Sequence, residues 1–200
     1  MFESLLAHRD EFARALRNFQ FEPTDDGRVL FPQQGVFVGG VFTHNVNGAD
    51  IRMDPNLIVN QGLNDLLGVY FANSTNRVTF YIAPYSNNVV PVATLTGTGG
   101  TAFATVQGET TNYTQATRPT WTQAGASSQT IGNDASPAQF TIGTGGIAAI
   151  YGAALLTGTG VKADAASTVL VACSAFASAR LNLLAADTLS IQYDITATST

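Results

Sequence analysis

Hydrophobic residues recur at helical spacing in the N-terminal segment of the chain. Its apolar positions are Leu5, Phe12, Leu16 and Phe19. Charged residues, including Asp10 and Arg14, occupy the positions between them. Apolar residues at these intervals lie on one side of a helix, so the pattern predicts an amphipathic helix over Phe2–Asn18.

A second helical pattern follows after a hairpin signal at Asn47-Gly48. Its apolar positions form one stripe: Val59, Leu63, Leu66, Leu67 and Tyr70. Asp54 precedes Pro55, and an acidic N-cap followed by proline is a typical helix start. The sequence therefore predicts a helix over Pro55–Phe71.

Most of the remaining apolar residues stand in short β-prone runs separated by glycine, serine, asparagine or proline. These runs are Arg28–Phe31, Gly35–Val46, Val78–Ala83, Thr101–Val106, Ala138–Ile142, Ile147–Leu156, Thr168–Cys173 and Thr188–Thr196. In the last run apolar and polar residues alternate, as in a half-buried strand. The predicted fold is mainly β: an antiparallel, jelly-roll-like sandwich with one inserted helix and an N-terminal helical arm.

Charge divides the chain unevenly, because residues 1–28 hold ten of its 23 charged side chains. We therefore expect an N-terminal arm over residues 1–50, made of the amphipathic helix and hairpin strands, and a β-sandwich domain over residues 51–200.

The second half of the chain is poor in charge. Between Val78 and Val161 only Glu109, Arg118 and Asp134 are charged, and charged residues make up 12% of the whole chain. Soluble proteins average about a quarter. A surface with so few charges is less soluble when exposed, so we expect other protein chains to cover part of it.

The composition also argues against two classes of partner. The chain has a single lysine and eight scattered arginines, whereas binding of duplex nucleic acid requires clustered cations. No apolar run reaches the roughly 18 residues of a membrane span, and the first residues do not resemble a signal peptide. With one cysteine, Cys173, in an apolar run, we expect a buried thiol and folding in a reducing cytoplasm.

Few residues suggest chemistry. His44, Asp50 and Asp54 could begin a metal site, but their spacing matches no ligand pattern, and a structural histidine explains them better. Gly158–Lys162 is the nearest approach to a phosphate-binding loop, yet it lacks the hydroxyl residue that should follow the lysine. We therefore predict no catalytic, cofactor-binding or metal-binding residues.

The segment Arg118-Pro-Thr-Trp121 contains the only tryptophan. A single tryptophan is usually a core residue, and we favour that position for Trp121. The alternative is an anchor between subunits, since Trp and Arg are enriched at interface hot spots. The candidate interface residues are Leu5, Phe12, Leu16, Phe19, Arg118 and Trp121.

Several segments, taken in order, resemble a recurring virion protein of tailed bacteriophages, of the head decoration or cement type. The helix string Asn56–Phe71 resembles the "N…V…GLN.LL…F" helix of that group. Val78–Pro84 resembles its aromatic strand, and Asn112–Trp121 its "Y…R..W" segment. Phe140–Ala153 and Phe176–Tyr193 resemble the closing strands. The likeness covers about residues 54–200 and brings no catalytic residues.

This resemblance implies a non-enzymatic structural protein of the virion. We expect a capsid cement or decoration protein that binds the major capsid protein and copies of itself. It would act at the capsid surface after assembly in the bacterial cytoplasm, without cofactors, nucleic acid or membrane. Two alternatives remain open: a tail or fibre-associated adaptor, and a carbohydrate-binding virion module that uses Tyr70, Tyr81, Tyr85 and Tyr113.

Overall fold

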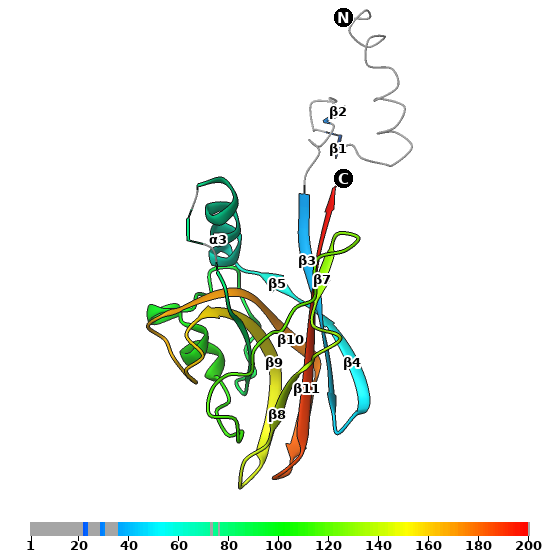
Figure 1. Cartoon of the computed structure of the whole chain (residues 1–200), viewed down its shortest axis with the longest axis vertical. Helices are drawn as coiled ribbons and strands as arrows, with labels where there is room; N and C mark the ends of the chain where they lie inside the picture. Colours follow the sequence, from blue (N-terminus) through cyan, green and yellow to red (C-terminus); the bar gives the residue numbers. More distant parts are fainter. Residues whose placement is uncertain (1–21, 24–28, 31–35, 73, 76, 200) are drawn as a thin grey trace, which may run out of the picture. The chain divides into compact units, whose positions relative to one another are not determined.

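The computed structural model describes residues 22–23, 29–30, 36–72, 74–75 and 77–199 (Figure 1). The chain divides into two compact units, and the larger one spans Val38–Thr198. In the other unit, strands β1 (Glu22–Pro23) and β2 (Val29–Leu30) pair in antiparallel fashion. The amphipathic helix predicted over Phe2–Asn18 and the arm residues Leu5, Phe12, Leu16 and Phe19 lie outside the described residues.

The larger unit is mainly β, with two antiparallel sheets in a sandwich-like fold, as the sequence predicts. In the four-stranded sheet the order is β5-β10-β9-β6. Its strands are β5 (Leu57–Ile58), β6 (Phe80–Tyr85), β9 (Ile147–Gly158) and β10 (Thr168–Leu183). In the five-stranded sheet the order is β4-β3-β11-β7, and β8 also pairs with β11. Its strands are β3 (Val36–Val46), β4 (Ala49–Pro55), β7 (Thr130–Gly132), β8 (Ala138–Thr141) and β11 (Thr188–Ser199).

One hydrophobic core lies between the two sheets. The alternation predicted for β11 is observed, because Leu189, Ile191 and Tyr193 are fully buried in this core. The Tyr193 ring stacks on Phe42 of β3 with centroids 4.1 Å apart. This face of β11 therefore forms part of the core between the two sheets.

A second core covers the outer face of the four-stranded sheet. Neighbouring residues of β9 point to opposite sides, with Leu155 in the first core and Leu156 in the second. A strand buried on both faces reads as a continuous apolar run, which accounts for the sequence of β9. The cover of this second core includes Phe103, which packs edge-on against Tyr85 of β6.

The strand predicted over Thr101–Val106 is wrong. This segment forms a 3-10 turn, η1 (Gly99–Thr101), and a π-helical turn, η2 (Ala104–Gly108). Gly99 and Gly108 have φ angles of +76° and +67°, a backbone conformation that turns the chain and that glycine adopts without strain.

The predicted inserted helix is present as α3 (Asn60–Phe71), but it begins later than expected. Asp54 and Pro55 belong to the edge strand β4 and do not cap a helix. The Asp54 carboxylate accepts hydrogen bonds from His44 and from the Ala177 amide, so it has contacts in the sandwich that compete with capping.

The apolar stripe of α3 does not face the core. Val59, the residue before the helix, is fully buried, whereas Leu63, Leu66, Leu67 and Tyr70 are exposed. The helix contacts the sheet through Gly62 instead, where an added Cβ would lie 2.3 Å from the Val171 carbonyl oxygen of β10. Helical periodicity therefore identified the element correctly but not the side that is buried.

The boundary expected at residue 50 is also wrong. Strand β3 lies between β4 and β11 in the five-stranded sheet, and the larger unit begins at Val38. The Asn47-Gly48 turn, with φ angles of +52° and +74°, joins β3 to β4 as the sequence predicts. Hairpin residues assigned to the arm are thus part of the sandwich.

Candidate functional site

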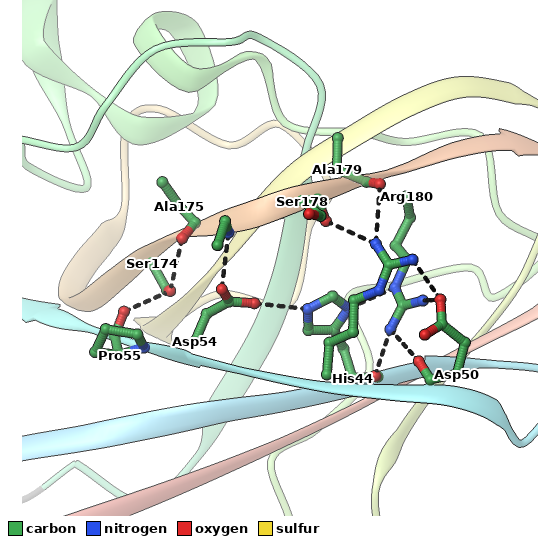
Figure 2. Close-up of polar contacts among 11 residues, drawn as sticks. His44, Asp50, Asp54, Pro55, Ser174, Ala175, Ser178, Ala179 and Arg180 are labelled. Carbon is green, nitrogen blue, oxygen red and sulfur yellow. Dashed lines mark hydrogen bonds and ion pairs between the residues drawn. The ribbon is translucent and has the colours of Figure 1, made fainter.

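The described residues contain one extensive group of interacting ionisable side chains, which we call the His44 cluster. It consists of His44 from β3, Asp50, Arg52 and Asp54 from β4, and Arg180 from β10 (Figure 2). Two irregularities in strand pairing occur at the cluster. The β3–β4 register shifts between His44 and Val46, and the β10–β9 register shifts between Ala175 and Arg180. Such bulges redirect side chains, here toward the space between the two sheets.

Both ring nitrogens of His44 are engaged. Nε2 lies 2.8 Å from Asp54 Oδ2, and Arg180 Nε donates to Nδ1 over 2.8 Å. Since the guanidinium can only donate, Nδ1 is the acceptor and Nε2–H donates to Asp54. The ring is fully buried and stacks on Phe176 with centroids 3.6 Å apart.

The surroundings keep this imidazole neutral. Burial lowers the pKa of His44 to about 4, and the positive charge of Arg180 acts in the same direction against the hydrogen bond to Asp54. At neutral pH His44 is therefore a neutral link between a carboxylate and a guanidinium.

Arg180 joins the cluster to the β3–β4 hairpin. It donates to the carbonyl oxygen of His44 over 2.7 Å and to Oδ2 of Asp50 over 2.7 Å. Asp50 also accepts a hydrogen bond from Arg52, which is the main reason that its pKa is lowered. The Asp50 carboxylate thus stays charged between two guanidinium groups.

The β4 side chains of the cluster also form hydrogen bonds with the backbone of β10. Short β5 pairs with β10 only at Ala172 and Cys173. Beyond that point Asp54 Oδ1 accepts from the Ala177 amide over 2.7 Å, and Arg52 donates to the Ser178 carbonyl oxygen over 3.1 Å. These bonds give the backbone of β10 side-chain partners at positions where β5 no longer pairs with it. The cluster therefore links the two sheets where strand pairing ends.

This geometry does not provide a general base. A catalytic histidine needs a ring nitrogen within reach of the proton that it removes. Both nitrogens of His44 face charged partners of the same chain, and the ring has no exposed surface. The contacts of His44 lie within its own chain, as expected for the structural role that the sequence favours. Over the described ranges, no group of three His, Cys, Asp or Glu residues is arranged to hold a metal ion.

A cavity of about 330 Å³ adjoins the cluster. Its charged lining residues already have partners: Asp50 pairs with Arg52 and Arg180, and Asp187 accepts from Asn47 and from the Leu184 amide. Among the residues described, no side-chain nitrogen or oxygen of this lining is both buried and unpaired.

Outside the His44 cluster, a fully buried ion pair lies in the loops over the four-stranded sheet. Arg118 donates to both carboxylate oxygens of Glu109, over 2.8 and 2.6 Å, and both side chains are completely buried. The Ala163 amide donates to the same carboxylate, and the Arg118 amide donates to the Gly160 carbonyl oxygen. Lys162, the lysine of the loop compared with a phosphate-binding loop, donates to the Tyr113 carbonyl oxygen over 2.7 Å. These contacts hold the loops that carry Glu109 and Arg118 against the loop over residues 160–163.

Trp121 is a core residue, the position that its sequence favours. It is 3% exposed, donates from Nε1 to the Tyr193 carbonyl oxygen over 2.9 Å, and meets the Phe80 ring edge-on. Arg118 is 1% exposed. The role of interface anchor named for Arg118 and Trp121 is therefore corrected: both are buried inside their own chain, so neither is available to a partner in this conformation.

Cys173 is buried as expected, and burial raises its pKa, so its thiol is unreactive at neutral pH. None of the helices that the structure describes is long and apolar enough to cross a membrane.

Comparisons with protein-family models, with curated proteins and with solved structures gave no match. The resemblance noted for residues 54–200 therefore stays a prediction.

Proposed function

We propose that this protein is a non-enzymatic structural component of a bacteriophage particle, and most specifically a decoration protein that binds the major capsid protein at the head surface. The resemblance of segments from Asn56 to Tyr193 to head decoration proteins of tailed bacteriophages suggests this role. Two features of the structure support it. The surface carries few charges, and the buried polar side chains pair within their own chain.

The observation that carries the proposal is the surface between Val78 and Val161. Of its three charged residues, Glu109 and Arg118 are buried against each other, which leaves Asp134 as the exposed charge of this whole span. Charged residues normally keep a free protein soluble, and large weakly charged surfaces favour protein contacts. Contact with a shell of other subunits would cover such a surface.

The polar interior supports a mechanical role. Each residue of the His44 cluster and of the Glu109–Arg118 pair contacts its own chain and strengthens a sheet edge or a loop. A decoration protein acts by bridging neighbours, with many modest contacts multiplied over the particle. A rigid sandwich suits this function.

The carbohydrate-binding alternative receives less support. Sugar stacking requires exposed aromatic rings, but Tyr85 and Tyr113 are buried and Tyr81 is partly buried. Tyr70 is the one strongly exposed ring of the four that the sequence suggested.

Co-expression with the major capsid protein encoded in the same genome tests the proposal. After gradient centrifugation the full chain should sediment with the assembled shells, and without capsid protein it should stay near the top. A chain that remains at the top while shells form would contradict a role as a decoration protein. Binding to tails purified from the same phage, without binding to the shells, would instead support the adaptor alternative.

A further inference from the structure

Helix α3 exposes most of its large apolar side chains. We call this surface the α3 face, formed by Leu63, Leu66, Leu67, Tyr70 and Phe71. Tyr70 and Phe71 are 79% and 82% exposed, and their ring centroids lie 6.1 Å apart. Positions 63, 66, 67 and 70 follow the i, i+3, i+4, i+7 spacing of a helix that packs against another helix.

The first turn of α3 provides its attachment to the sheet. Gly62 allows the helix backbone to approach Val171 closely, and Gln61 Oε1 accepts hydrogen bonds from the Gly97 and Leu170 amides. In Figure 1 the rest of α3 projects beyond the strands of the four-stranded sheet. Within the part of the chain that the structure describes, the α3 face has no cover.

The charge on α3 favours a copy of the same surface as its partner. Asp65 is the single charged residue of the helix. Arg77 donates to it from Nε over 2.9 Å and from Nη2 over 2.5 Å, so the pair is neutral. A charged partner would find no opposite charge here, whereas two identical neutral, apolar faces can meet without repulsion.

We propose that the α3 face is the contact between two copies of this chain, with the helices packed about a two-fold axis. In such an isologous contact the same side chains serve both partners, so each copy covers the leucines and the aromatic pair of the other. This inference concerns the chain in solution and does not depend on the particle role.

The size of the face sets the expected strength. An aromatic side chain buries about 150–250 Å². Tyr70, Phe71 and three half-exposed leucines therefore offer on the order of 500 Å² per copy, below the roughly 800 Å² of a standard interface. The dimer should be reversible and depend on concentration in the micromolar range. On a larger surface that holds copies side by side, their higher effective concentration would increase the fraction of dimer.

Sedimentation equilibrium of the full chain tests the proposal. The wild type should rise from monomer toward dimer mass with concentration, and Leu67→Glu should remain monomeric at every concentration. Leu184→Glu is the matched control, because Leu184 is 69% exposed and follows the end of β10 opposite to the α3 attachment. It should associate like the wild type. Circular dichroism checks that each variant folds. If Leu67→Glu does not fold, Phe71→Glu takes its place as the variant that disrupts the contact.

Cysteine cross-linking locates the contact. Because Cys173 is buried, Leu67→Cys introduces the one reactive thiol of the described sandwich. Mild oxidation should link this variant into a dimer and leave a Leu184→Cys variant monomeric. A wild type that stays monomeric, or a dimer that survives both glutamate substitutions, would overturn the proposal. If the wild type is monomeric and a maleimide cannot label Leu67→Cys, another part of the same chain covers the face, and the proposal is equally refuted.

Discussion

Burial in the fold opposes the protonation of His44. In the unfolded chain a histidine binds a proton below about pH 6.5, whereas in the folded chain the pKa is about 4. Between these values the unfolded state holds more protons, so stability falls as the pH falls. The loss is about 1.4 kcal/mol per pH unit and approaches about 3 kcal/mol near pH 4.

His44→Gln isolates this effect. Glutamine offers an acceptor for Arg180 and a donor for Asp54 but does not titrate. Urea unfolding at a series of pH values from 7 to 4 should give a shallower loss of stability for the variant than for the wild type. Equal slopes would show that His44 is not held neutral.

Replacing one carboxylate oxygen of the Glu109–Arg118 pair by an amide nitrogen should lower the stability of the fold strongly. Glu109→Gln leaves the Arg118 charge buried without a counter-charge, which should cost about 3–5 kcal/mol. The double substitution Glu109→Gln with Arg118→Met removes both charges. It should cost less than Glu109→Gln alone, as measured by chemical denaturation. If the double variant is the less stable one, the unpaired buried charge is not the main cause of the destabilisation.

Two substitutions at Trp121 separate the contribution of core packing to stability from the contribution of its hydrogen bond. Trp121→Ala should destabilise the chain by about 3–5 kcal/mol, because it removes a buried ring. Trp121→Phe keeps an aromatic ring beside Phe80 but loses the bond to the Tyr193 carbonyl oxygen, and should cost about 1–3 kcal/mol. Thermal melts of the two variants should rank in that order. A normal melting temperature for Trp121→Ala would contradict the core position.

At the scale of secondary structure, strand β3 determines where the chain can be shortened. Deletion of residues 1–50 removes β3 together with His44, so β4 and β11 lose the strand that lies between them. We expect this variant to be unfolded by circular dichroism. A variant that lacks residues 1–35 keeps β3 and should fold. A folded 1–50 deletion would show that the sandwich does not need β3.

Sequence patterns predicted those elements in which burial against neighbouring elements produces a regular pattern of apolar residues. Strand β11 alternates because one of its faces is buried, and β9 is continuously apolar because both faces are. Strand β4 was missed, since its inward residues Arg52 and Asp54 are polar and pair with groups of the His44 cluster. The stripe of α3 was recognised, but periodicity cannot tell a face that meets the core from one that does not.

At the scale of the whole molecule, the cluster itself could only partly be predicted. His44, Asp50 and Asp54 lie close together in the sequence and stand out as a group. Arg180 is 136 residues from His44 and carries no local signal. Its role follows from the bulge in β10, which no single-sequence pattern revealed. The sequence grouped His44 with its partner Asp54 but not with its partner Arg180.

The central claim is that this chain is a structural part of a particle, and quantitative mass spectrometry of purified particles tests it most directly. Full-length chain should be present at a copy number comparable with that of the major capsid protein, and in a fixed ratio between preparations. A copy number matching that of tail proteins would support the adaptor alternative. Particles that are complete and infectious without any of this chain would contradict the account.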